Sequence, residues 1–152
     1  MGGVGMDSRM KDLNRRRAVD TYKIIHQMLS DIDGNVEVKN LSDEEKKKIQ
    51  EKKDQLLSIC RKLPMQIKEN DLITVLAYYR KENEDKEKKS IGAKIEKALE
   101  EWLIDNFLEE KRYEIKSLIS YLTKCDFIEY QLFTKEAIEY AIWLKRNAEG
   151  IL

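Results

Sequence analysis

The single proline of the chain, Pro64, lies between two stretches with the periodicity of an amphipathic helix. Apolar residues recur at spacings of three and four on both sides of it, which places them on one helix face. They are Ile49, Leu56, Ile59, Cys60 and Leu63 before the proline, and Ile67, Leu72, Val75, Leu76 and Tyr79 after it. Proline lacks a backbone N–H and suits the first turn of a helix, not its interior. We therefore expect two helices to meet at an angle at Leu63-Pro64, with both apolar faces in one core.

A second break is expected at Asn70-Asp71, because both side chains compete for hydrogen bonds with the local backbone. One short helix would then lie between the two breaks. Aspartate is less free than glycine to adopt a positive φ, so we expect a tight cap at Asp71 and not a left-handed kink.

The rest of the chain indicates further helices and no strand. We expect helices at about 7–29, 42–63, 71–80, 91–106, 113–122 and 127–149, with Ser42 and Asp126 as N-caps and Gly150 at the last C-terminus. The predicted buried residues are Leu13, Ala18, Tyr22, Ile25 and Leu29 in the first helix, and Ile128, Leu132, Ala137, Ala141 and Leu144 in the last. The fold class is therefore all-α, a single-domain bundle of about six helices over 9–150. Residues 1–8 are expected to be disordered, and 31–41 and 81–90 to be flexible connections.

The charge balance restricts the possible partners. Charged residues make up 38% of the chain, yet the formal net charge is zero, so any nucleic-acid site must be a local patch. Cys60 and Cys125 lie in apolar helical stretches, which favours reduced thiols over a disulfide. No apolar run is long enough to span a membrane, and the chain does not start with a charged and then apolar leader. We therefore predict a cytoplasmic protein.

The sequence does not indicate an enzyme. His26 is the only histidine, and helical ribonucleases of the HEPN type carry an arginine upstream of theirs at a spacing where this chain has Asp20 and Thr21. Phosphate-binding glycine loops and nucleophile motifs are absent. Acidic pairs such as Glu44-Glu45 are typical of solvated helix faces. We predict no catalytic residue, no metal site and no cofactor.

Three groups of basic residues remain as candidates for binding phosphates. They are Arg15, Arg16 and Arg17, then Arg61 and Lys62, and finally Lys145 and Arg146. Guanidinium groups could bind phosphates, but solvated positions and interactions with helix C-termini are equally compatible with these spacings. The aromatic residues Tyr78, Tyr79, Trp102 and Trp143 favour core or interface positions, with base stacking as the lesser alternative.

Several short motifs of the sequence occur in the same order as in one protein family. They are Arg15-Arg16-Arg17-Ala18 with Tyr22, Leu57-Ser58, Arg61-Lys62-Leu63-Pro64 with Ile67, Asn70-Asp71-Leu72, Glu101-Trp102-Leu103, Asp126-Phe127, Thr134-Lys135-Glu136-Ala137 and Trp143-Leu144-Lys145-Arg146-Asn147-Ala148. The chain thus resembles the small helical subunit of the type III-B CRISPR effector, the Cmr complex, over nearly its whole length. It departs from the family at Asp71, where glycine is common, at Tyr78-Tyr79, where Phe-Leu is usual, and at Asn147, which replaces a typical Phe.

The resemblance implies a non-catalytic structural subunit used in antiviral defence. Copies of it would stack into a minor filament, beside backbone and large subunits, and would contact the guide–target RNA duplex. The implied RNA-binding residues are Arg15, Arg16, Arg17, Arg61, Lys62, Lys145 and Arg146, with Arg16, Arg61 and Arg146 first. Three alternatives stay open: a helical scaffold that binds no nucleic acid, a helical ribonuclease, and the small subunit of the type III-A effector.

Overall fold

The computed structural model describes residues 2–34, 40–84 and 90–152, without the side chains of 2–10 and 82–84. These parts form six α-helices, one short 3₁₀ helix and no strand. The helices are α1 (Gly2–Asp33), α2 (Asp43–Asn70), α3 (Leu72–Glu84), α4 (Ile91–Phe107), the 3₁₀ helix η2 (Glu109–Lys111), α5 (Leu118–Lys124) and α6 (Phe127–Ile151). The predicted all-α, single-domain bundle of about six helices is confirmed.

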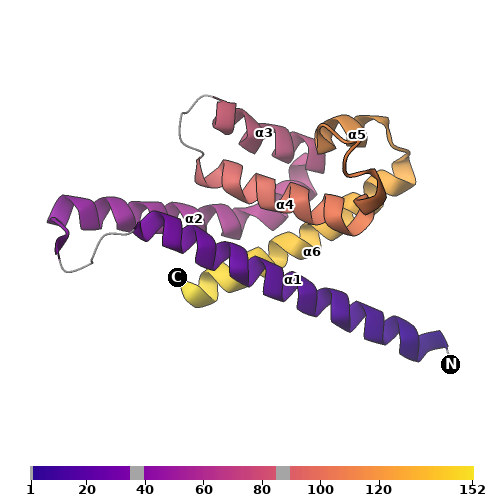
Figure 1. The fold of residues 1–152 in the computed structure, drawn as a ribbon, viewed down its shortest axis with the longest axis horizontal. Helices are drawn as coiled ribbons and strands as arrows, with labels where there is room; N and C mark the ends of the chain where they lie inside the picture. Colours follow the sequence, from indigo (N-terminus) through magenta and orange to yellow (C-terminus); the bar gives the residue numbers. More distant parts are fainter. Residues whose placement is uncertain (1, 35–39, 85–89) are drawn as a thin grey trace.

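The long helices α1 and α6 cross one another beside α2, and the shorter α3, α4 and α5 lie together at one end of the bundle (Figure 1). Helix α6 makes the most extensive contacts, with α2 and with α1, and α4 packs on both α3 and α6. The C-terminal half of α1 and the C-terminal end of α6 therefore lie together beside α2 (Figure 1).

The core follows one stripe of α6. Ala137, Tyr140, Ala141, Leu144 and Ala148 are fully buried and recur at spacings of three and four. Three of them are alanines, whose small side chains let neighbouring helices approach closely. They pack in one cluster with the buried face of α2, which consists of Leu56, Cys60, Leu63 and Ile67.

The prediction of a corner at Pro64 is wrong, because α2 continues through the proline as one helix of 28 residues. The missing N–H of Pro64 removes the backbone hydrogen bond to the carbonyl of Cys60, and an interior proline costs about 3 kcal/mol. Leu56 and Leu63 before the proline and Ile67 after it are nonetheless all buried. Burial of each such side chain contributes about 1.5–3 kcal/mol, so a continuous buried face outweighs the proline.

Helix α2 ends at Asn70-Asp71, where a break is expected. The prediction that Asp71 would form a tight cap without positive φ is wrong. Asp71 has φ 81° and ψ 146°, and it is the only non-glycine residue with positive φ in the described parts. Glycine is the usual residue in this region of backbone space, and other residues need external support. Tyr130 of α6 supplies it, since its hydroxyl donates to the Asp71 carboxylate and accepts from the backbone N–H of Ile73 at 3.2 Å.

The N-caps are confirmed, and several helix ends differ from those expected. Ser42 accepts from the N–H of Glu45 at 3.2 Å, and Asp126 accepts from the N–H of Glu129 at 2.7 Å. Helix α1 extends from residue 2 to residue 33 and so begins before the expected start near residue 7, while the disorder expected for residues 1–8 stays a prediction. Each residue added to a nucleated helix gains one backbone bond, which extends helices past weak local signals. Gly150 lies inside α6, and parts of the expected connections, 35–39 and 85–89, lie outside the described residues.

Burial in the first and last helices is partly as predicted. Ala137, Ala141 and Leu144 of α6 are buried, and so is Ile25 of α1. The predictions for Tyr22, Ile128 and Leu132 are wrong, because these side chains are 51%, 73% and 54% exposed. Ile128 and Leu132 lie on a different side of α6 from the stripe that contacts α2, and Phe133 and Tyr140 are buried instead.

The backbone at residue 71 gives a direct test. We expect Asp71→Gly to be more stable than Asp71→Ala by about 1–2 kcal/mol, because both lose the bond with Tyr130 but only glycine adopts positive φ without strain. Urea unfolding measures the difference. At the exposed Ala77 of α3, alanine should be the more stabilising residue, so Ala77→Gly should lower the free energy of unfolding by about 1 kcal/mol relative to the wild type. Equal stability of the two Asp71 variants would contradict the observed backbone conformation.

Candidate nucleic-acid interface

Six of the seven predicted basic residues are exposed and one is not. The exposed ones are Arg15 and Arg16 of α1, Arg61 and Lys62 of α2, and Lys145 and Arg146 of α6. Arg16 contacts α4, Arg61 pairs with Glu149 near the C-terminal end of α6, and Arg146 stacks on Trp143 of α6.

Arg17 is the exception, because its guanidinium forms an ion pair inside the bundle. Its Nε and Nη2 donate to the two carboxylate oxygens of Glu136 at 2.7 and 2.6 Å, and the two side chains are only 12% and 5% exposed. Trp102 of α4 donates its indole N–H to the same carboxylate at 3.0 Å. The bond to Glu136 raises the pKa of Arg17 against the effect of burial, so Arg17 stays charged and joins helices.

Arg16 lies on the surface beside this ion pair. Its Nη2 donates to the side-chain oxygen of Asn106 at 2.9 Å, and its guanidinium lies 5.8 Å from the ring centre of Trp102. Both contacts are with α4, so Arg16 is oriented by the packing of α1 on α4. One face of the guanidinium is held by these contacts, while the side chain as a whole remains exposed.

Arg61 pairs with Glu149 near the last turns of α6, which carry Lys145 and Arg146, and we name these three cations the α6 basic end. Arg61 reaches across from α2, with its Nε 3.4 Å from a carboxylate oxygen of Glu149. Glu149 lies about one helical turn after Lys145 and Arg146, so its partner Arg61 lies beside the last turns of α6. The two side chains of the Arg61–Glu149 pair are 56% and 40% exposed, and such surface pairs contribute little stability. The Arg61 guanidinium can therefore exchange Glu149 for another anion.

Arg146 is held in a defined orientation by an aromatic residue. Its guanidinium lies 4.9 Å from the ring centre of Trp143, which is a cation–π contact. Trp143 is itself fixed, because its indole N–H donates to the side-chain oxygen of Asn14 in α1 at 2.6 Å. Asn147, one turn further along α6, donates to the carbonyl of Ala18 at 3.1 Å. The position of Arg146 thus depends on the contact between α1 and α6.

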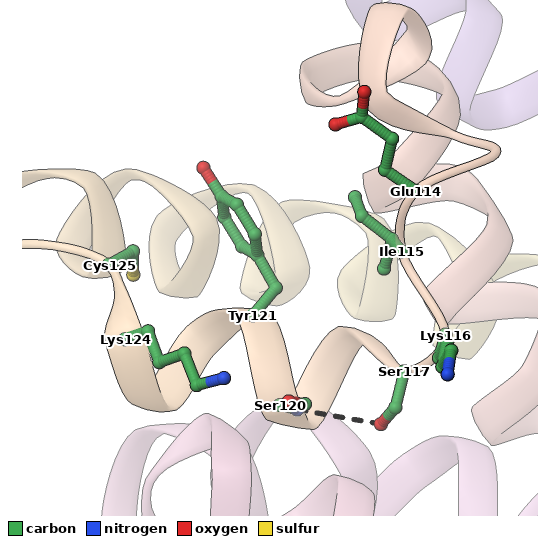
Figure 2. Close-up of a pocket in the computed structure, with 8 residues that line it drawn as sticks. All are labelled: Glu114, Ile115, Lys116, Ser117, Ser120, Tyr121, Lys124 and Cys125. Carbon is green, nitrogen blue, oxygen red and sulfur yellow. Dashed lines mark hydrogen bonds between the residues drawn. The ribbon is translucent and has the colours of Figure 1, made fainter.

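Sequence reasoning did not single out Lys116 and Lys124, which line a surface hollow of about 450 Å³ around α5. Figure 2 shows them at opposite ends of α5, with the hydrogen bond from the N–H of Ser120 to the hydroxyl of Ser117 between them. Isolated lysines give no sequence signal for such a site. Cys125 also lines the hollow, but burial raises the pKa of its thiol, so the thiol is protonated at neutral pH and weakly nucleophilic.

The described parts of the chain hold no group of three or more His, Cys, Asp or Glu residues placed to bind a metal ion. His26 is exposed on α1, and its ring centre lies 4.3 Å from that of Tyr22. Within the described residues, the helices are too short or too polar to cross a membrane.

The structural role of Arg17 predicts a stability effect. Arg17→Met should lower the free energy of unfolding by about 3 kcal/mol, because Glu136 then keeps a buried charge without its partner. Arg15→Met, on the exposed side of the same helix, should change it by less than about 0.5 kcal/mol. Adding Glu136→Gln to Arg17→Met should recover part of the difference. Urea unfolding checks all three, and equal effects at positions 15 and 17 would contradict the assignment.

The family model described as CRISPR-associated protein (Cas_Cmr5) matches residues 34–151. A search among curated proteins gave no match. The matched range contains Arg61, Lys62, Lys145 and Arg146, and it begins at the end of α1, after Arg15, Arg16 and Arg17. Because the match covers most of the chain, the protein belongs to the Cas_Cmr5 family and is a small Cmr5-type subunit of the type III-B CRISPR effector.

Proposed function

We propose that this chain is a non-catalytic structural subunit of the RNA-guided effector. It would stack with copies of itself into a minor filament and contact the guide–target RNA duplex through exposed basic side chains, in antiviral defence in the cytoplasm. The observation that carries the proposal is the α6 basic end, where a cation from α2 joins two cations of α6 within the family-matched part of the chain.

The chemistry of the α6 basic end suits contacts that do not depend on sequence. Guanidinium groups bind phosphate oxygens in a planar, two-pronged geometry, and such contacts position a protein on a nucleic acid without reading its bases. An RNA-guided complex obtains its specificity from base pairing, so its protein subunits need only backbone contacts. A net charge of zero is compatible with this role, because the binding cations are concentrated at one place.

Contacts with other protein subunits have a separate surface available. Phe127, Ile128 and Leu132 at the start of α6 are 74%, 73% and 54% exposed. Adjacent exposed apolar side chains of this size are typical of protein interaction sites. They lie at the opposite end of α6 from the α6 basic end, so one subunit could contact protein and RNA at the same time.

The absence of a catalytic role is also part of the proposal. Burial raises the pKa of Cys60 to about 12, and burial also raises the pKa of Cys125, so neither thiol supplies a thiolate at neutral pH. Cleavage of RNA would then belong to other subunits of the effector.

A second candidate is a helical scaffold that contacts only protein. The pairing of Arg61 with Glu149 favours it, because a basic side chain that already has an acidic partner needs no phosphate. The two candidates differ in what the α6 basic end contacts inside the assembled effector.

Reversing the charges of the α6 basic end separates the two candidates. Arg61→Glu, Lys145→Glu and Arg146→Glu together should weaken retention of target RNA by the assembled effector. The slope of log affinity against log salt should become shallower by about 0.7–0.9 for each phosphate that the protein no longer neutralises. The measurement is an RNA-binding titration at several salt concentrations.

The matched control makes the same change of charge elsewhere. Lys46→Glu, Lys47→Glu and Lys48→Glu alter three exposed lysines in the first turns of α2. This variant should keep the wild-type affinity and salt slope. Unchanged RNA binding by the α6 variant would favour the protein-only scaffold. Equally weakened RNA binding by both variants would show that overall charge, and not the α6 basic end, causes the effect.

A further inference from the structure

A second surface hollow lies between the C-terminal part of α2 and the helix α3 that follows it. It has a volume of about 200 Å³ and is lined by Gln66, Asn70, Thr74, Val75, Tyr78 and Tyr79. None of these six side chains is charged, although 38% of the residues in the chain are. A charged group entering the hollow would find no countercharge there, so a neutral occupant is favoured.

An exposed aromatic ring forms one wall of this hollow. Tyr78 is 60% exposed, while its neighbour Tyr79 is only 4% exposed. The two rings meet edge to face, with centres 5.0 Å apart and planes at 79°. The hydroxyl of Tyr79 donates to the side-chain oxygen of Gln66 at 2.7 Å, which ties α3 to α2. The ring of Tyr78 therefore packs on the buried ring of Tyr79, and its exposed part is open to a planar ligand.

The hydrogen-bonding groups around this ring suit a heterocycle. The carboxamide oxygen of Gln66 already accepts from Tyr79, so its Nε2 is the donor that remains for a ligand. Asn70 adds both a donor and an acceptor, and Thr74 adds a hydroxyl. Carboxamides and hydroxyls next to an aromatic ring are the groups with which proteins bind unpaired bases.

We propose that this hollow binds one unpaired nucleobase of single-stranded RNA, stacked on Tyr78. The inference rests on the proposed contact of this subunit with RNA and adds a base-binding position to it. Lys62 lies one helical turn before Gln66 on α2, and Lys81 lies about one turn after Tyr78 on α3. Both lysines are exposed, and both lie on the side of the hollow away from the break at Asp71. They are placed to bind the phosphates on either side of the stacked base.

The test compares RNA with and without bases. The full chain is titrated at low salt with a short single-stranded RNA that contains 2-aminopurine, and with an abasic ribose-phosphate chain of the same length. The wild-type protein should bind the base-bearing strand more tightly and quench its fluorescence. Tyr78→Ala should weaken that binding about 5- to 100-fold and relieve the quenching, without a change in affinity for the abasic chain.

Three further variants control this comparison. Tyr78→Phe keeps the ring and should behave like the wild type. Tyr113→Ala removes a tyrosine that is 100% exposed and lies outside the hollow, and it should change nothing. Lys62→Glu should weaken binding of both strands by the same factor, because it removes a backbone contact.

The outcomes also distinguish this site from the function on which it rests. The inference is wrong if the wild-type protein does not prefer the base-bearing strand. It is also wrong if Tyr78→Ala weakens binding of both strands equally, or weakens binding of neither. If Tyr78→Ala instead prevents incorporation into the effector while RNA binding is unchanged, the hollow binds protein and the inference is also wrong. The proposed function fails separately, when charge reversal at the α6 basic end leaves RNA retention by the assembled effector unchanged.

Discussion

The arrangement of the helices depends on the hydrogen bonds that the buried carboxylate of Glu136 accepts. It lies on α6 and accepts two hydrogen bonds from Arg17 of α1 and one from Trp102 of α4. The ring of Trp102 stacks on Tyr140, with centres 5.1 Å apart, and the hydroxyl of Tyr140 donates to Asp20 at 2.6 Å. A buried carboxylate is costly unless its oxygens are satisfied, so α1, α4 and α6 must all be in place together.

This constraint also positions the candidate RNA-binding surface. Once α1 is fixed against α6, Asn14 can hold Trp143, and Trp143 in turn orients Arg146. The arginines thus divide into two kinds. Arg17 joins the helices, whereas Arg61 and Arg146 are exposed near the C-terminal end of α6. A subunit with zero net charge can in this way concentrate exposed cations at one end of a helix.

The sequence predicted features that depend on near neighbours. The caps at Ser42 and Asp126 involve residues only three positions apart, and the break at Asp71 comes from side chains that compete with the local backbone. Features that depend on distant residues were missed. The local preference of Pro64 is overridden by burial of α2 against α6, and the positive φ of Asp71 is supported by Tyr130.

In the candidate site, too, only the features that depend on near neighbours could be predicted. Its seven basic residues could be identified by residue type, but their grouping could not. Arg61 and Glu149 are 88 positions apart, and Arg17 and Glu136 are 119 positions apart, so no local pattern shows which arginine is buried and which is exposed. The apolar character of Ile128 and Leu132 predicts that both are buried in the core, although their side of α6 is exposed in the described parts of the chain.

Photocrosslinking tests most directly whether the α6 basic end contacts RNA. The effector would be assembled with guide RNA and with target RNA containing 4-thiouridine, irradiated, digested and analysed by mass spectrometry. We predict crosslinked peptides of this subunit from the end of α6, around Lys145 and Arg146, and from α2 around Arg61. Crosslinks confined to the first turns of α2, or found only in other subunits, would contradict it.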